Sequence, residues 1–211
     1  MVFSYALNMY SVIGDVIGSR ALPDRRAAQR RIGEVLAEVD RAVPGVQPLE
    51  ATVGDEFQGA YATLGEATRA TLLVRLALLP AIDVRCGIGQ GEAMVFDDQR
   101  TPRLQDGPAW WAAREAIEWM AGARRAGLRS WLVGPDAAVV NAHLLCRDAL
   151  VDRLNERGWR MLRAALLGRS QQRIAEQEGV TKSAVSQQFS RGISALRDAQ
   201  ALLEQDPVGG G

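Results

Sequence analysis

The sequence predicts a mixed α/β (α+β) protein that ends in an all-helical segment. Short β-rich runs alternate with helical patterns in the order strand, helix, hairpin, helix, strand, helix, strand. This order contains the βαββαβ pattern of a ferredoxin-like sheet covered by helices. From residue 139 onward every apolar pattern has helical spacing. We therefore expect a sheet domain at 1–138, a connecting helix or helices at 139–167, a separate helical unit at 168–205 and a disordered tail at 206–211.

The first strand and the first helix have clear boundaries. Residues 10–17 form a β-rich run that is closed by Gly18 and Ser19. Asp24 suits the N-cap of a helix that continues to about residue 42, because its carboxylate can accept free amides of the first turn. Apolar side chains recur along one face of that helix, at Ile32, Val35, Leu36 and Val39.

The remaining elements are separated by turn residues. Residues 49–59 predict a hairpin of two short strands about a Gly54-Asp55 turn. Pro80 stops the next helix, and glycines close the strand that follows it. In order, we expect a helix at 65–79, a strand at 82–89, a polar loop at 97–106, a helix at 110–123 and a strand at 130–133.

Composition excludes several classes of protein. The 211 residues carry 25 basic and 25 acidic side chains, so the total charge does not indicate a polyanion binder. Two cysteines make no disulfide framework, and the single His143 excludes a histidine-rich zinc site. No apolar run reaches about 18 residues and no signal-peptide pattern is present, so we expect a cytoplasmic protein without a membrane span.

Acidic residues at two expected strand ends indicate a metal site. Asp15 interrupts the apolar strand VIGDVIG, where a carboxylate is costly to bury without a partner. A ferredoxin-like sheet would bring it beside the hairpin that carries Asp55 and Glu56. Neighbouring carboxylates repel unless a cation neutralises them, and Mg²⁺ prefers such oxygens. The alternative is that Asp15 caps a turn and Asp55 only makes a hairpin.

Four motifs in sequence order resemble the catalytic domain of class III nucleotidyl cyclases. They are VIGDVIGS, EATVGDEFQGAY, DVRCGIGQGEAM and GPAWWAAREAIE, which together cover about residues 10–120. The GDEF tip also resembles the GGDEF hairpin of diguanylate cyclases, and the whole chain resembles the SatD family. The resemblance implies a nucleotide with Mg²⁺ or Mn²⁺, and a homodimer in which Arg114 faces the metal site of a partner chain.

The resemblance assigns roles to single residues. Asp15 and Asp55 match the two metal-binding aspartates, and Arg114 matches the arginine that stabilises charge on the phosphates. The expected nucleotide-binding residues are Gly14, Val16, Ile17, Gly18, Ser19, Gly54 and Trp110.

Two positions depart from the family pattern. Trp110 stands where the catalytic asparagine is expected, and Ala51 where a lysine would read adenine. Trp110 and Trp111 either pack their helix on the sheet or form a shelf on which a purine stacks. The departures favour sensing a nucleotide over converting it.

Residues 169–188 have the pattern of a helix-turn-helix and resemble the DNA-binding part of sigma-70 region 4. Ser170 and Thr181 suit N-caps, and Gly179 suits the tight turn. The start of the second helix reads base edges in this motif. The expected DNA contacts are Arg169, Arg173, Thr181, Lys182, Ser183, Ser186, Gln187 and Arg191. A helical hairpin used only for packing or dimerisation is the alternative.

These patterns together predict a DNA-binding transcription regulator with a cyclase-like, Mg-nucleotide-sensing domain. An active nucleotidyl cyclase or nucleotide-processing enzyme with a DNA-binding tail is the alternative. A third possibility is a helical end that binds protein rather than DNA.

Overall fold

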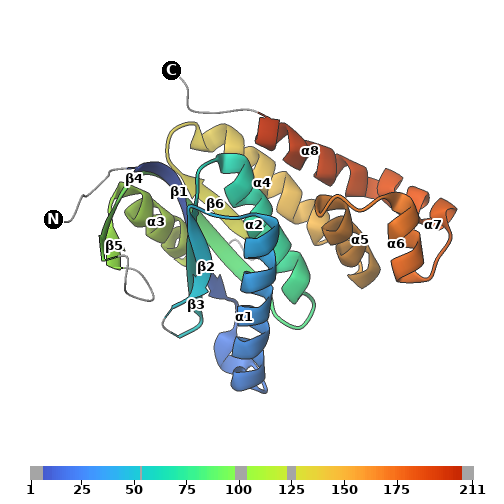
Figure 1. Cartoon of the computed structure of the whole chain (residues 1–211), viewed down its shortest axis with the longest axis horizontal. Helices are drawn as coiled ribbons and strands as arrows, with labels where there is room; N and C mark the ends of the chain where they lie inside the picture. Colours follow the sequence, from blue (N-terminus) through green and yellow to red (C-terminus); the bar gives the residue numbers. More distant parts are fainter. Residues whose placement is uncertain (1–6, 53, 98–103, 123–126, 206–211) are drawn as a thin grey trace.

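The computed structural model describes residues 7–52, 54–97, 104–122 and 127–205 (Figure 1). Within these residues one mixed sheet has the strand order β2-β3-β1-β4-β5, and β6 pairs in parallel with β4. The strands are β1 (Leu7–Val16), β2 (Gln47–Ala51), β3 (Glu56–Tyr61), β4 (Val84–Asp97), β5 (Leu104–Asp106) and β6 (Ser130–Val133). The arrangement β2-β3-β1-β4 confirms the predicted ferredoxin-like sheet.

The structure differs from two expectations, which concern the polar loop and the end of the strand after Pro80. The end of the expected polar loop forms β5, which pairs with β4, while residues 98–103 lie outside the described residues. The tail expected at 206–211 also lies outside them. Strand β4 continues past the glycines that were expected to close it, because those glycines serve packing rather than a turn.

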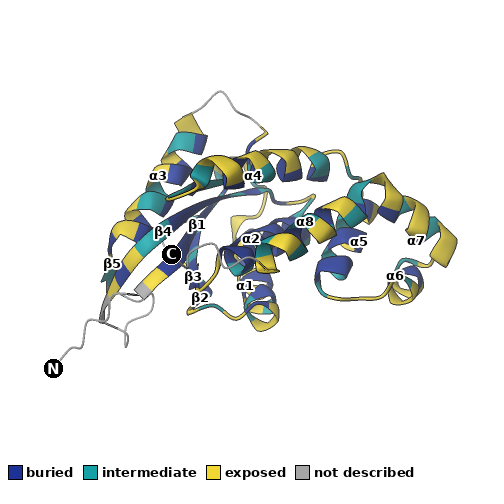
Figure 2. Ribbon diagram, turned by 90° about the horizontal axis from the view of Figure 1, so that it is seen from above, coloured by how far each residue is buried: buried dark blue, intermediate teal, exposed yellow. Residues whose placement is uncertain are grey.

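Helices cover both faces of the sheet. Helices α1 (Arg25–Ala42) and α2 (Leu64–Leu78) pack on one face and enclose the larger core. Asp24 caps α1 as predicted, since its carboxylate accepts a hydrogen bond of 2.9 Å from the amide of Ala27. In Figure 2 the buried residues line the sheet and the inward faces of the helices, whereas the outward faces are exposed.

Helix α3 (Pro108–Gly122) lies on the opposite face, directly on a row of glycines in β4. A Cβ on Gly87 would stand 2.3 Å from the carbonyl oxygen of Ala113, and one on Gly89 would stand 2.1 Å from that of Ala109. No side chain larger than hydrogen fits at these positions without moving the helix. The glycines therefore permit the short distance between α3 and the sheet.

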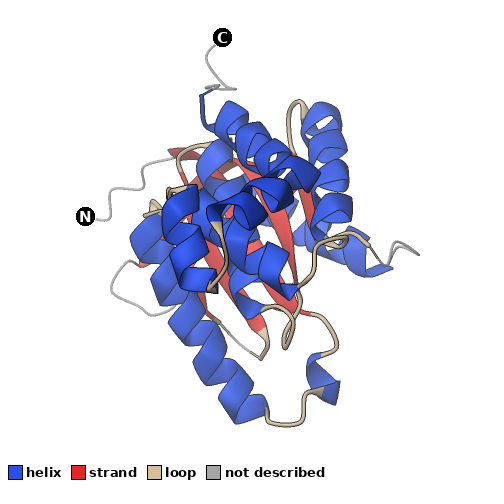
Figure 3. Cartoon of the chain, turned by 90° about the vertical axis from the view of Figure 1, so that its right-hand side faces the viewer, coloured by secondary structure: helices blue, strands red, loops and turns tan. Residues whose placement is uncertain are grey.

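The first C-terminal helix packs against β6, and several of the following helices lie toward the end of the molecule away from the sheet (Figure 1). Figure 3 shows helices in front of the sheet when the molecule is seen from that end. The C-terminal helices are α4 (Ala137–Val151), α5 (Glu156–Leu166), α6 (Gln171–Glu178), α7 (Lys182–Gln188), a π-helical turn η2 (Phe189–Ile193) and α8 (Ser194–Gln205). Among the described residues, no helix has the length and apolar character needed to cross a membrane.

The helical end is packed onto the sheet domain. Buried Ile174, Val185 and Phe189 belong to the same apolar core as the helices on the sheet. Helix α8 lies against α2, and the side-chain amide of buried Gln200 donates a hydrogen bond of 2.9 Å to the carbonyl oxygen of Gly65. A Cβ at Gly65 would stand 2.7 Å from the Cα of Glu204, so glycine permits this close approach.

Candidate functional site

Three charged side chains face one another across neighbouring strands. Asp15 on β1 is in register with Glu56 on β3 and with Arg85 on β4. Residues directly opposite in antiparallel strands project to the same face of the sheet. The guanidinium of Arg85 donates from Nε to Oδ1 of Asp15 at 3.0 Å and from Nη2 to Oδ2 at 2.6 Å. Asp15 therefore has a cationic partner within its own chain.

Glu56 has a second arginine as its partner. Arg114 reaches it from α3, donating from Nη1 to Oε1 at 2.7 Å and from Nη2 to Oε2 at 2.8 Å. Such a pair of parallel charge-assisted bonds fixes the geometry of both side chains. Arg114 thus lies against the site of its own chain. Its expected role in a partner's site stays a prediction, and it would require this ion pair to open.

Asp55 completes the charged cluster, which we define as Asp15, Asp55, Glu56, Arg85 and Arg114. It follows Gly54 at the hairpin tip, where a φ of 77° favours glycine. The hydrogen bond to Asp15 raises the pKa of Arg85, although partial burial opposes this, and the charges of Asp15 and Asp55 add to the rise. The hydrogen bond to Glu56 is likewise the main cause of the raised pKa of Arg114.

The structure places Asp15 opposite Glu56 and pairs each of these two predicted acids with an arginine. Among the residues that the structure describes, no three His, Cys, Asp or Glu side chains form a group arranged to hold a metal ion. The sequence reasoning missed Arg85. Its signal was its position in DVRCGIG, the strand expected to pair with the one that carries Asp15.

The loop after β1 offers fewer free amides than the resemblance implied. The amide of Ile17 donates to the carbonyl oxygen of Asp83 at 2.9 Å, so it is not free for a phosphate. Gly18 is exposed with a φ of 66°, and Ser19 begins the short helix η1 (Ser19–Ala21). Val16 is buried in the larger core.

Gly14 has a packing role in this structure. A Cβ there would lie 2.1 Å from the ring of buried Phe57, its register partner on β3. The missing side chain makes room for the phenyl ring rather than for a ligand.

The two tryptophans of α3 have different environments. Trp110 is buried in the smaller core between α3 and the sheet, as the packing interpretation predicted. Trp111 is 61% exposed, and its indole N–H donates to the carboxylate of Asp106 at 2.5 Å. Ala51, at the position where a base-reading lysine was considered, is exposed at the end of β2.

The expected helix-turn-helix geometry is present in α6 and α7. Ser170 accepts a hydrogen bond from the amide of Arg173, and Thr181 accepts one from the amide of Ala184. Gly179 ends α6 in the left-handed region with a φ of 63°. Ile174 and Val185 are buried between the helices. The predicted caps and turn of this motif are thus confirmed.

The exposed face of this motif lies at the start of α7. Lys182, Ser183, Ser186 and Gln187 are all exposed there, together with Thr181 at the cap. Figure 1 shows α6 and α7 at the end of the molecule away from the sheet. Helix α7 ends at Gln188 and continues into η2, inside which Gly192 has a φ of 136°.

The flanking arginines differ in their partners. Arg169 and Arg191 are exposed and form no ion pair within the described residues. Arg173 pairs with Glu176 at 3.1 Å, and both side chains are more than half exposed, so this pair is weak.

The sheet topology is that of a nucleotidyl cyclase-like fold. The structure is similar to that of a bacterial light-regulated adenylyl cyclase, with a TM-score of 0.52 and 13% identity over 64% of this chain and 45% of that chain. The guanylyl cyclase Cya2 gives a TM-score of 0.44 and 14% identity over 55% of this chain and 72% of that one. The chain therefore spans less than half the length of the light-regulated enzyme.

The sequence model of the SatD family matches residues 9–197. The chain belongs to the SatD family, as its sequence motifs had suggested. No curated protein sequence matches it significantly.

Proposed function

We propose that the protein is a DNA-binding transcription regulator whose cyclase-like domain senses a nucleotide. The observation that carries this proposal is the exposed start of α7. Lys182, Ser183, Ser186 and Gln187 are exposed on a capped helix in a helix-turn-helix. Glutamine suits adenine and lysine suits guanine in the major groove. Arg169 and Arg191 are exposed and would contact phosphates in this proposal.

The charged cluster supports an anionic nucleotide as the ligand of the sheet domain. Two guanidiniums, of Arg85 and Arg114, lie on one face of the sheet next to three carboxylates. A polyphosphate that arrives with a divalent cation can exchange these partners, because phosphates pair with arginines and the cation pairs with Asp15 and Asp55. When bound, the cation would neutralise charge on the phosphates. The residues fit this ligand only if the ion pairs open.

Sensing suits these residues better than catalysis. The position of the catalytic asparagine holds Trp110, which is buried in the core and cannot contact a ribose without unpacking α3. The position of the adenine-reading lysine holds Ala51. The alternative, an active cyclase or other nucleotide-processing enzyme, is tested by incubating the protein with each nucleoside triphosphate and Mg²⁺ or Mn²⁺ and analysing products by mass spectrometry.

The proposal is tested by fluorescence anisotropy on a DNA site selected from a random library. The right nucleotide with Mg²⁺ should change DNA affinity by roughly 5–150-fold, the usual range of allosteric coupling. Asp55→Asn should abolish this response and leave basal DNA binding unchanged. Gln187→Ala should lose sequence preference and still bind nucleotide. If no DNA sequence is enriched, the reader assignment is wrong; if no nucleotide alters binding, the sensor assignment is wrong.

We also propose that the protein acts as a homodimer. Two copies of α7 would read two half-sites, and the symmetric arrangement doubles a modest set of phosphate contacts. The mass of one chain is 22.9 kDa. Light scattering should give a protein mass of twice this value when nucleotide or DNA is present. A protein mass of one chain in the presence of nucleotide and in the presence of DNA would contradict the proposed dimer.

A further inference from the structure

Helix α4 has its charged residues inside and apolar residues outside. Its two residues that are charged at neutral pH, Arg147 and Asp148, are only 3% and 1% exposed. Both have partners within the chain, since Arg147 donates to Asp148 at 3.0 Å and Asp148 accepts from the amide of Ser130 at 2.9 Å. A surface helix normally carries its charged residues outward. The exposed positions of α4 from 138 to 149 instead form an apolar surface, which we call the α4 face: Ala138, Val139, Ala142, Leu145, Cys146 and Ala149.

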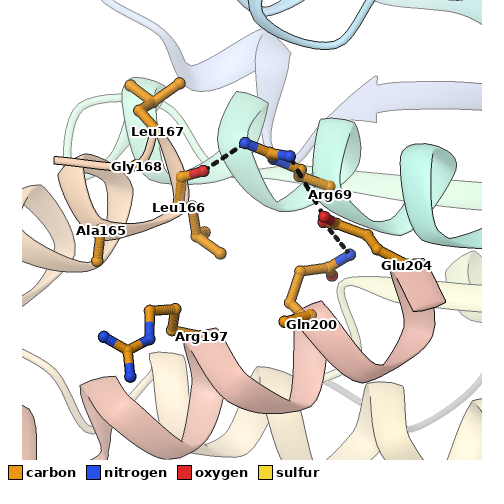
Figure 4. A pocket seen from close by; sticks show the side chains of 9 residues that line it. Arg69, Ala165, Leu166, Leu167, Gly168, Arg197, Gln200 and Glu204 are labelled. Carbon is orange, nitrogen blue, oxygen red and sulfur yellow. Dashed lines mark hydrogen bonds and ion pairs between the residues drawn. The ribbon is translucent and has the colours of Figure 1, made fainter.

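Other helices carry charge outward or are covered by a neighbouring helix. The exposed positions of α1 include Arg30 and Glu34. Figure 4 shows how α2 and α8 cover each other, with Arg69 paired to Glu204 at 3.3 Å. Figure 2 shows the outer side of α4 exposed at the surface of the molecule. Because burial of apolar surface is favourable, the α4 face indicates a binding partner outside this chain.

The α4 face has the spacing of a seam between two helices. Ala138, Ala142, Leu145 and Ala149 follow one another at intervals of four, three and four residues. This is the heptad spacing that keeps apolar side chains along the contact with a second helix. Three of the four residues are alanine, so the second helix can approach closely. The face therefore fits an apolar helix of the same kind.

One end of the α4 face projects, and the other end borders a hollow. Val139, near the start, is 77% exposed. The hollow has a volume of about 480 Å³ and is lined by Leu145, Ala149, Asp152, Arg153, Gly127 and Leu128. In an antiparallel pair of α4 helices with the two-fold axis between residues 143 and 144, Ala138 lies beside the partner's Ala149. Val139 of each copy then lies at the hollow of the other copy, so the face complements itself.

The charges at the two ends of α4 also favour an antiparallel pair. Asp136 precedes the helix and Arg153 follows it, both are exposed, and neither forms an ion pair with another described residue. Asp152, next to Arg153, is already paired with Arg75 at 2.5 Å. An antiparallel pair brings Asp136 of each copy toward the partner's Arg153, whereas a parallel pair brings like charges together. Antiparallel helix dipoles also attract each other.

We propose that a second copy of this chain covers the α4 face through an antiparallel, two-fold symmetric pair of α4 helices. The proposal rests on the homodimer proposed above and names the face that forms it. The α4 face shares no residue with the charged cluster. This contact is therefore distinct from the arrangement in which Arg114 faces the site of a partner chain.

The first test is sedimentation equilibrium of the full chain without DNA or nucleotide, up to the highest soluble concentration. The wild type should dimerise. Leu145→Glu places two carboxylates at the centre of the pair and should raise the dissociation constant of the dimer at least about tenfold. Leu202→Glu makes the same change at a leucine of α8 that is 66% exposed and should dimerise like the wild type.

The outcomes separate this inference from the proposed homodimer. If the wild type dimerises and Leu145→Glu dimerises equally well, the α4 face is refuted and the homodimer stands. If the wild type is a monomer without ligand and a dimer with nucleotide or DNA, the homodimer again stands and the α4 face is refuted. A monomer under all conditions refutes both.

Cysteine cross-linking tests the register and does not depend on the folding of Leu145→Glu. In a Cys146→Ser background, Ala138→Cys together with Ala149→Cys should give a disulfide-linked dimer on mild oxidation. The two positions lie about 16 Å apart along one helix, too far for a disulfide within a chain. Each single cysteine variant is the matched control and should stay unlinked. Cross-linking of the single variants indicates a parallel pair, and no cross-linking of the double variant contradicts the pair; either result overturns the proposal.

Discussion

Asp15 and Arg85 face each other in register on β1 and β4, and the guanidinium of Arg85 binds both carboxylate oxygens of Asp15. The side chains are only 18% and 22% exposed, so solvent screens this pair weakly. A guanidinium thus occupies the place on Asp15 that the sequence interpretation gave to a metal ion. A ligand of Asp15 must compete with this pair.

The first prediction concerns the strength of this pair. Arg85→Gln should lower the free energy of unfolding by about 2 kcal/mol, because it leaves a mostly buried carboxylate without its cation. Urea denaturation of Arg85→Gln, Asp15→Asn and the double variant closes a double-mutant cycle. The double variant should lose less than the sum of the single losses. Additive losses mean that the two side chains do not interact in solution.

A second prediction concerns cations. In Arg85→Gln the charged cluster keeps its three carboxylates and one arginine, Arg114. Mn²⁺ should therefore raise the melting temperature of this variant more than that of the wild type, since binding to the native state alone stabilises it. The triple variant with Asp15→Asn and Asp55→Asn should not respond. An equal response in all three proteins shows that Mn²⁺ binds elsewhere.

The third prediction concerns the backbone conformation of Gly179 in the turn of the helix-turn-helix. A Cβ at Gly179 or at Gly33 meets no atom within 4 Å, but only Gly179 has a positive φ, at 63°. Gly179→Ala should destabilise by about 1 kcal/mol, because alanine is strained in the left-handed region. Gly33→Ala, in the middle of α1, should stabilise by about 0.5–1 kcal/mol. Thermal unfolding shows the sign, and changes of the same sign would contradict the turn geometry.

The fourth prediction concerns pH. Burial lowers the pKa of His143, and the charge of Arg147 lowers it further, although Asp148 opposes this. As the pH falls, His143 therefore binds a proton in the unfolded chain at a higher pH than in the folded chain. Stability should fall as the pH drops below the ordinary histidine value of about 6.5 and continue to fall until the folded pKa is passed. Urea unfolding at a series of pH values measures this slope, and His143→Gln should flatten it. If the unfolding free energy of His143→Gln depends on pH as that of the wild type does, groups other than His143 cause the dependence.

Local features of this chain were readable from its sequence. Asp24, Ser170 and Thr181 act as helix caps and Gly179 forms the turn, because each depends only on residues within about one helical turn of itself. The strand order followed from the succession of elements, since few topologies accommodate a βαββαβ chain. The same topology predicted that Asp15 lies beside the hairpin, and the register of β1 with β3 places it opposite Glu56.

Only the tertiary structure decided which partner each charge has. Arg85 is 70 residues from Asp15, and Arg114 is 58 residues from Glu56. Their pairing depends on strand register and on the height of α3 above the glycines of β4, which no local pattern encodes. The docking of α8 on α2 through Gln200 and Gly65 is equally non-local, and it joins the helical end to the sheet domain. Side-chain periodicity is a property of one segment, whereas charge compensation and close helix contact are properties of two segments that meet only after folding.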